Sequence, residues 1–172
     1  MIQNLMAYEE AGYKVVHKGE NFEIRYYEER IVIQRRYDSG NSGFRKLFNY
    51  ISGQNQGEKK IEMTTPVTEV QDDNQMVMQF YLPARFNASS APLPADNSLE
   101  IATIDAGYFA VIQYSGFASN KNFYKHAQIL KSSLDRDNIE ISSQPIKATY
   151  DGPFTLPNLR RNEAMYLVLW DN

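Results

Sequence analysis

The sequence predicts an α+β fold in which a mostly antiparallel β-sheet curls toward a barrel and two helices pack outside it. Three observations lead to this prediction. Large β-favouring side chains are abundant, with 12 Tyr and 9 Phe beside only 9 Gly. Short β-favouring runs are interrupted by only two stretches of helical periodicity. The order strand, strand, helix, strand, strand occurs twice, which predicts a pseudo-two-fold repeat of a β-β-α-β-β unit.

The length predicts one domain. A chain of 172 residues corresponds to about one domain of ordinary size and buries enough surface to hold a core without cross-links. We therefore treat residues 1–172 as a single domain with halves at about 13–83 and 99–170. The segment 84–97 between them carries Pro92 and Pro94 among Ser, Ala and Asn residues, which is typical of a loop.

The first half begins with β-favouring runs. Residues 13–17, 22–27 and 31–37 are short, rich in Tyr, Val and Ile, and separated by polar turns, so they predict a meander. A later run alternates apolar and other side chains with a period of two, which indicates a strand that buries one face. The apolar positions of that run are Met76, Met78, Phe80 and Leu82. Pro83 ends this strand.

A helix is predicted between these strands. Its apolar side chains recur at i, i+3, i+4 and i+7: Phe44, Leu47, Phe48 and Ile51. Asn41 or Ser42 can cap its first turn by accepting a hydrogen bond from a free backbone N–H. Gly53 is suited to end it.

The second half repeats this plan. Residues 99–104 and 108–114 predict two strands around a tight turn at 105–107. A second amphipathic helix follows, with Ser119 or Asn120 as its cap. Its buried face is predicted to contain Phe123, Ala127, Leu130 and Leu134. Short strands are predicted at 139–142 and 146–150, and the fully apolar run 164–170 predicts a central strand covered on both faces.

Composition excludes several classes of function. The net charge of -3 gives no basic field that would attract nucleic acid. The absence of Cys excludes disulfides, thiolate metal sites, a cysteine nucleophile and covalent heme attachment. No membrane span and no secretory leader are visible, so we expect a soluble, cytoplasmic monomer.

The sequence also lacks enzyme signatures. It contains no G-x-S-x-G, phosphate loop, G-x-G-x-x-G or H-E-x-x-H motif. The only two histidines, His17 and His126, are predicted on a strand and on a helix, too few for a His-rich metal centre. We therefore expect a protein that is not an enzyme and has no firm metal site.

Three stretches, taken together, resemble a known family. They are Gly43 to Gly53 (GFRKLFNYISG), Lys60 to Thr68 (KIEMTTPVT), and Tyr150 to Phe154 (YDGPF) with Arg160 to Glu163 (RRNE). In this order and spacing they are similar to the SOUL/heme-binding protein family over about residues 13–170. The resemblance implies a distorted β-barrel with two helices. It also implies reversible, non-catalytic binding of heme or another tetrapyrrole, for buffering, transport or sensing.

The resemblance places the tetrapyrrole site on the first helix and on a late loop. A porphyrin needs a broad apolar face, aromatic contacts and cations for its propionates. The residues carried over are Phe44, Arg45, Leu47, Phe48, Tyr50, Ile51, Phe154, Leu159, Arg160 and Arg161. The stripe that contains Phe44 and Leu47 is equally typical of core packing, so Tyr50, which lies off that stripe, is expected to be the better ligand contact.

The chain departs from the family pattern at a position where some members have a histidine that could bind the heme iron. Some members have a histidine in the strand motif that is FEIRYY here, and Tyr26 holds that place. Tyr26, His17 and His126 are the candidate ligands to a heme iron. The expected cofactor is heme b or free porphyrin, bound non-covalently.

Two other functions remain open. The repeated barrel is similar to the effector-binding domains of bacterial regulators, some relatives of which are hydrolases, so the same cleft could bind another amphipathic small molecule with Glu163 in a polar role. Glu163 is most simply paired with Arg160 or Arg161, whereas burial without a partner would raise its pKa and suit it to acid–base chemistry. The second alternative is a protein-interaction module that uses an exposed aromatic patch.

Overall fold

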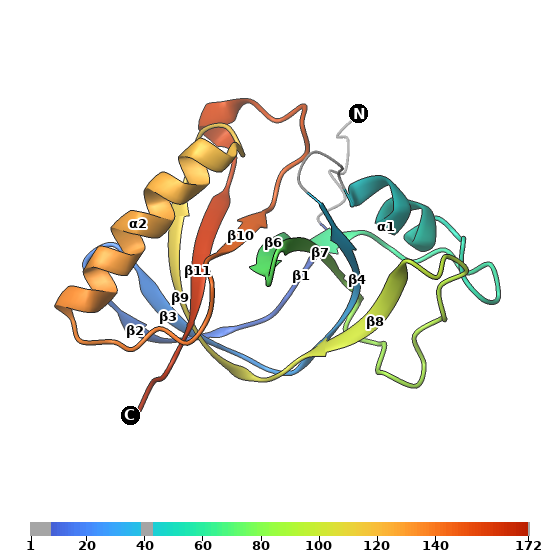
Figure 1. The fold of residues 1–172 in the computed structure, drawn as a ribbon, viewed down its shortest axis with the longest axis horizontal. Helices are drawn as coiled ribbons and strands as arrows, with labels where there is room; N and C mark the ends of the chain where they lie inside the picture. The colour runs from blue at the N-terminus through green and yellow to red at the C-terminus, as the bar shows by residue number, and fades with distance from the viewer. Residues whose placement is uncertain (1–7, 39–42, 172) are drawn as a thin grey trace, which may run out of the picture.

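A nine-stranded antiparallel sheet forms the body of the computed structural model, which describes residues 8–38 and 43–171 (Figure 1). The strand order is β2-β3-β9-β11-β10-β6-β7-β4-β8. Their bounds are β2 Lys14–Lys18, β3 Glu23–Tyr27, β4 Arg30–Tyr37, β6 Val67–Asp72, β7 Gln75–Tyr81, β8 Leu99–Ile104, β9 Gly107–Tyr114, β10 Ile146–Thr149 and β11 Asn162–Val168. A separate parallel pair joins β1 (Glu9–Glu10) to β5 (Thr64–Thr65).

One long ribbon connects the two halves of the sheet. β3 pairs with β9 from Glu23 opposite Val111 to Tyr27 opposite Gly107. β4 pairs with β8 in the same register, beginning with Arg30 opposite Ile104. The two ladders are therefore one antiparallel ribbon that bends between Tyr27 and Arg30. Figure 1 shows this bend at the bottom of a curled, open sheet.

The predicted repeat is present in the strand pairing. β3-β4-α1-β6-β7 is followed by β8-β9-α2-β10-β11. Within the halves β4 pairs with β7 and β9 pairs with β11, while β6 and β10 pair with each other across the halves. The two units have matching partners, which confirms the α+β fold and its pseudo-two-fold plan.

The helices α1 (Phe44–Ile51) and α2 (Asn120–Arg136) lie outside opposite walls of the curled sheet (Figure 1). Alternating residues of each strand face them, so each helix closes its own apolar cluster. α2 covers a cluster that includes Ile24, Ala110, Ile112, Ala164 and Tyr166. α1 covers a cluster that includes Ile33, Met78, Phe80 and Leu99. A third cluster, built around Tyr27, Phe109, Val111 and Met165, lies on the opposite, inner face of the sheet.

The helix ends agree with the sequence where the structure describes them. The backbone N–H of Asn122 donates to Ser119 Oγ at 3.2 Å, which confirms Ser119 as the cap of α2. Gly53 has φ +119° just beyond α1, a conformation that favours glycine, and so confirms the predicted stop. Asn41 and Ser42 lie outside the described residues, and Gly43 occupies the cap position of α1.

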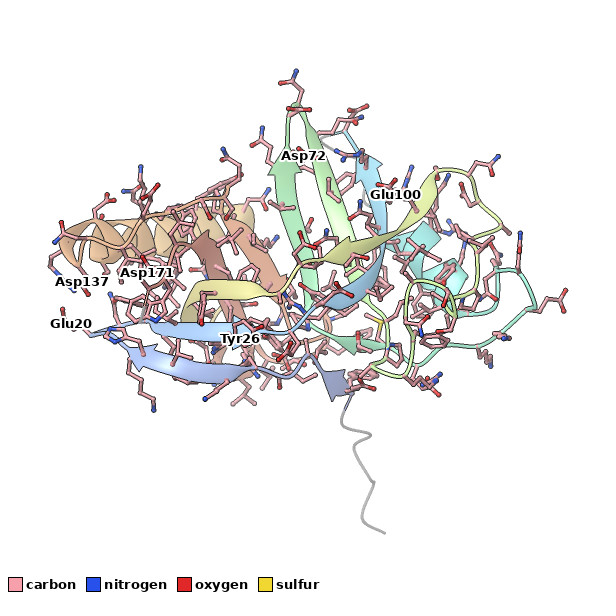
Figure 2. The ribbon with its side chains drawn as sticks, turned by 90° about the horizontal axis from the view of Figure 1, so that it is seen from below. Glu20, Tyr26, Asp72, Glu100, Asp137 and Asp171 are labelled. Atoms are coloured by element: carbon pink, nitrogen blue, oxygen red, sulfur yellow. The ribbon has the colours of Figure 1, made fainter. Side chains whose placement is uncertain are left out.

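The far end of α2 is held to the sheet by charge. Arg136 forms ion pairs with Glu20 at 2.9 Å and with Asp137 at 3.1 Å. Figure 2 shows Glu20 and Asp137 together at this end of the molecule. These side chains are exposed to water, so the pairs position the turn between β2 and β3 more than they stabilise the fold.

Some elements differ from the sequence prediction. Residues 139–142 form only an isolated bridge, Ile141 with Val168, instead of a strand. β6 and the short β1 and β5 were not predicted, because their mixed polar sequences lack a clear period. β11 lies between β9 and β10 and is almost entirely buried, as predicted for the central strand. Within 8–38 and 43–171, no helix combines the length and the apolar character that crossing a membrane would need.

Candidate functional site

The outer edge of α1 carries two exposed aromatic rings. Phe44 is 42% exposed and Phe48 is 48% exposed. Their rings are stacked, with centroids 6.0 Å apart and planes 13° apart, and Phe44 also contacts Phe80 edge-on at 5.2 Å. Arg45 is exposed beside them. We call Phe44, Arg45 and Phe48 the α1 edge.

The buried face of α1 is rotated from the one that the sequence predicts. Leu47, Tyr50 and Ile51 are buried, and Leu47 and Tyr50 have no exposed surface. The Tyr50 hydroxyl donates to the Pro92 carbonyl oxygen at 2.6 Å. Burial raises the pKa of Tyr50 to about 12. The expectation that Tyr50 lies off the buried face of α1 was therefore wrong, because the segment after Phe86 covers the side of α1 on which Tyr50 lies. Leu47 and Ile51 serve the core as well, and a ligand contact by these three residues stays a prediction.

The late loop, residues 150–161, exposes its apolar side chains. Phe154 is 99% exposed, and Leu156 and Leu159 are also mostly in water. The loop contains the short 3-10 helix η1 (Pro157–Leu159). Figure 1 shows the loop and α1 on the same upper side of the molecule, away from the bend of the long ribbon. The two parts of the predicted site thus come from opposite halves of the repeat.

Arg160 fastens the late loop to itself. Its Nε donates to the Thr155 carbonyl oxygen at 2.7 Å, and Nη2 donates to the Pro153 carbonyl oxygen at 2.9 Å. Its guanidinium carbon lies 5.8 Å from the centre of the Phe117 ring. Arg160 is therefore bound to the loop backbone and is not the partner of Glu163.

Glu163 is the centre of a buried ion-pair network. Its carboxylate has no exposed surface. Arg25 Nη1 donates to both of its oxygens at 3.0 Å, and Arg161 donates to Oε1 from Nε at 3.1 Å and from Nη2 at 2.9 Å. The Tyr150 hydroxyl donates to Oε2 at 2.7 Å. The sequence predicted Arg160 or Arg161 as the partner, and the structure shows Arg161. Arg25, which lies 138 residues away, had no signal in the sequence.

The network extends through stacked rings. The Arg161 guanidinium lies 3.8 Å from the centre of the Tyr150 ring, and its Nη2 also contacts the Glu10 carboxylate at 2.9 Å. The Arg25 guanidinium lies 4.1 Å from the centre of the Tyr13 ring. The N-terminal segment that carries Glu10 and Tyr13 is thus tied to the inner face of the sheet.

The contacts of this network favour the charged form of Arg25 and the neutral form of Tyr150. Burial lowers the pKa of Arg25 and is the largest single effect, but the Glu163 carboxylate, together with Tyr27 and Glu23, outweighs it, and the net shift is upward. Burial and the negative Glu163 both raise the pKa of Tyr150 far above its ordinary value. A carboxylate held by two guanidinium groups and a hydroxyl has no free electron pair aimed at a substrate. These contacts contradict the interpretation of Glu163 as a general acid or base.

The three candidate iron ligands lie on three different elements. His17 is on β2 and its ring packs on Trp170, with centroids 4.9 Å apart. His126 is on α2, stacked on Tyr114 at 4.0 Å, with Nδ1 2.8 Å from the Asn122 carbonyl oxygen. Tyr26 packs on Tyr108 at 5.2 Å and lies on β3 near the middle of the molecule (Figure 2). None of the three belongs to α1 or to the late loop.

A cleft of about 700 Å³ opens beside the bend of the long ribbon. Tyr26 lines it, and so does Arg30. Its other lining residues come from the N-terminal segment, the turn from β3 into β4, β5, and the end of β7 with the segment that follows it: Glu9, Glu10, Ala11, Gly12, Tyr13, Lys14, Glu28, Glu29, Ile31, Thr64, Tyr81, Leu82, Pro83, Ala84, Phe86 and Asn87. Residues of α1 and of the late loop are not among them. The sequence did not predict this cleft.

The chain has relatives by sequence over nearly its whole length. The family model described as SOUL heme-binding protein matches residues 8–167. Heme-binding protein 1 of Xenopus laevis is 28% identical over 172 residues, which cover 90% of this chain and 89% of that protein. Heme-binding protein 2 of Homo sapiens is 26% identical over 163 residues, which cover 86% of this chain and 78% of that protein.

Solved structures share the fold at much lower identity. The C-terminal domain of EcmrR has a TM-score of 0.65 at 14% identity, with 91% of this chain and 98% of that chain covered. A hydrolase from Listeria innocua has a TM-score of 0.62 at 7% identity, with 90% of this chain and 94% of that chain covered. At such identities the likeness concerns the fold alone.

Proposed function

The chain belongs to the SOUL heme-binding protein family, and from this premise we propose that it binds heme or another tetrapyrrole reversibly, without catalysing a reaction on it. The names of its relatives, heme-binding proteins 1 and 2, support the ligand class. Buffering, transport or sensing of the tetrapyrrole would each use such binding. Attachment is non-covalent in this proposal, because the 172 residues contain no Cys.

We propose that the ligand binds between the α1 edge and the late loop. The observation that carries this proposal is the exposure of Phe44, Phe48 and Phe154 on these two segments. Covering a large apolar side chain contributes about 1.5–3 kcal/mol when it is fully buried, so a flat apolar ring gains from this surface. Leu156 and Leu159 extend the apolar area on the loop. Large apolar side chains that are exposed to water in this way are typical of binding surfaces.

The polar part of the ligand needs a cation nearby. Arg45 is exposed on the α1 edge and can meet a propionate, whereas the hydrogen bonds of Arg160 and the ion pairs of Arg161 already occupy those two guanidinium groups. The candidate iron ligands lie on other elements. The proposal therefore rests on apolar contact and one charge, and it applies to heme and to iron-free porphyrin alike.

The test is a titration of the purified protein with hemin and, separately, with protoporphyrin, followed by absorbance and by the fluorescence of Trp170. We expect both ligands to saturate near one equivalent. The paired substitutions Phe44→Ser with Phe48→Ser, and Phe154→Ser with Leu159→Ser, should each weaken binding of both ligands. Leu93→Ser is the matched control, because Leu93 is also exposed, at 56%, but lies on neither segment.

Three results would count against the proposal. If neither ligand saturates, the family name does not describe the activity of this chain. If both saturate but the paired variants bind as the Leu93→Ser control does, the tetrapyrrole site lies elsewhere. If hemin alone saturates, iron ligation and not apolar contact carries the binding.

A further inference from the structure

Arg30 lines the cleft at the bend of the ribbon and is surrounded by aromatic rings. Its guanidinium carbon lies 4.3 Å from the centre of the Tyr27 ring, 4.8 Å from that of Tyr81 and 5.4 Å from that of Phe109. These rings come from β3, β7 and β9 and hold the guanidinium in one place. Aromatic faces stabilise a cation, but they offer no acceptor in the plane of its N–H groups.

The hydrogen-bonding capacity of Arg30 is not satisfied by the protein. Its Nε is buried and has no hydrogen-bond partner among residues 8–38 and 43–171. No carboxylate in that part of the chain forms an ion pair with it, in contrast to Arg25 and Arg161, which both hold Glu163. A guanidinium that is partly buried and lacks an anion is costly, and an incoming anion removes that cost. The unmet donor is therefore a reason to expect an anionic ligand in the cleft.

The walls of the cleft favour an apolar ligand with a single negative charge. Beside Arg30 they present Ile31, Leu82 and Phe86, which suit an apolar or aromatic body. The other charged side chains at the same cleft are Lys14 and four carboxylates, of Glu9, Glu10, Glu28 and Glu29, and Glu10 is paired with Arg161. The carboxylates repel a ligand with several negative charges more strongly than a ligand with one. A carboxylate forms a bidentate pair with a guanidinium and carries one charge, so the acidic side chains of the cleft repel it less than they repel a phosphate dianion.

We propose that this cleft is a second ligand site, which binds a small apolar or aromatic monocarboxylate through Arg30. The site is distinct from the tetrapyrrole surface, because residues of the α1 edge and of the late loop do not line it. The carboxylate lies against the guanidinium edge, and the ring or alkyl body packs on the wall that includes Phe86.

The test compares two probes that differ in charge and not in shape, 2-naphthoate and 2-naphthamide, by calorimetric titration of the full chain. We expect the naphthoate to bind about tenfold more tightly than the amide, the preference that a charge-assisted hydrogen bond typically provides. Arg30→Gln should abolish this preference. Arg36→Gln is the matched control, because this substitution removes the same charge from the same strand. Arg36 is paired with Asp72 and lies outside the cleft.

Three further measurements test the proposal without Arg30→Gln, in case that variant folds poorly. Phe86→Ala should weaken both probes to a similar degree and leave the preference for the acid intact. Equal binding of acid and amide by the wild-type chain, or an equal loss of preference in Arg36→Gln, would overturn the assignment to Arg30. Displacement of bound hemin by 2-naphthoate would overturn the claim that the two sites are separate, and unchanged hemin binding at saturating naphthoate would support it.

Discussion

Arg25 Nη1 lies 3.0 Å from each carboxylate oxygen of Glu163, and both side chains are buried. Arg25 stands on β3 and Glu163 on β11, which both pair with β9, so one strand separates them in the sheet. Their contact lies on the inner face of the curled sheet, next to the cluster around Tyr27 and Phe109. The relationship makes Glu163 an element of the scaffold.

Removing one partner of this pair should destabilise the fold. Glu163→Leu removes the buried anion from Arg25, which keeps only Glu23, and from the partly buried Arg161, which keeps only Glu10. We expect the free energy of unfolding to fall by about 3 kcal/mol. The double variant Arg25→Met with Glu163→Leu should recover part of that loss. Urea unfolding of the three proteins checks this, with Glu62→Leu, which breaks the exposed pair with Arg85, as a control of little effect. A Glu163→Leu protein as stable as wild type would show that the network does not hold the sheet.

The two faces of α1 should respond differently to truncation. Leu47→Ala opens a cavity in the core below α1, and we expect a loss of about 2–5 kcal/mol in the free energy of unfolding. Phe48→Ala should cost clearly less, because 48% of the side chain is already exposed. Denaturant unfolding of both variants tests this. Equal losses would mean that Phe48 is a core residue and not part of an exposed edge.

Stability should fall in strong alkali through buried tyrosines. Burial raises the pKa values of Tyr27, Tyr50 and Tyr114 to about 12, whereas tyrosines in the unfolded chain titrate near 10. Below about pH 10 the neutral form is present in both states, and between about pH 10 and 12 the unfolded state holds fewer protons, so stability falls as the pH rises.

Unfolding measured at a series of pH values, with tyrosinate absorbance on the folded protein, checks this prediction. Tyr50→Phe should show a smaller alkaline loss than wild type. Tyrosinate absorbance that rises for all tyrosines near pH 10 while the protein stays folded would contradict the burial of these hydroxyls.

Tyr26, His17 and His126 should not act together on a heme iron. Each packs on a different ring, of Tyr108, Trp170 and Tyr114 respectively. We therefore expect Tyr26→Phe, His17→Gln and His126→Gln each to leave the absorbance spectrum of bound hemin unchanged. A loss of the Soret shift in one variant would identify that residue as the axial ligand and would move the tetrapyrrole site to its surroundings.

The start of α2 offers a local test of the fold. Ser119 accepts a hydrogen bond from the Asn122 backbone, and Ser119→Ala should lower the free energy of unfolding by about 1 kcal/mol. Ser132→Ala, at an exposed position inside the same helix, should stabilise slightly, because Ala has the higher helix propensity. Thermal unfolding of both variants distinguishes the two effects by their sign.

Most elements of the fold followed from local sequence patterns. Both helices were predicted from apolar spacing and from Ser119 and Gly53 at their ends. The central position of β11 followed from its unbroken apolar run. The strand predicted at residues 139–142 was wrong. Ile141 forms an isolated bridge with Val168, and the backbone bonds of Glu140 with Leu169 and of Ser142 with Leu167 flank that bridge without extending it into a ladder.

The candidate site was predicted less completely. The exposure of Phe48 and of Phe154 agrees with a binding role, but Tyr50 proved to be buried. On a short helix, a rotation by about one residue exchanges an exposed position for a buried one. The segment that includes Pro92 covers one side of α1, and this contact buries Tyr50. The cleft that Arg30 lines had no signal in the amino-acid sequence, since its walls come from segments that are distant along the chain.

The sequence by itself determined the family of this protein, its two helices and its repeated plan, because these depend on motifs and on periodicity. Only the tertiary structure decided that Glu163 is held by Arg25 and Arg161, and that Arg30 lies among three rings without an anion. Burial and ion pairing depend on which distant strands become neighbours. The bend and register of the long ribbon set those neighbours, and no local pattern encodes them.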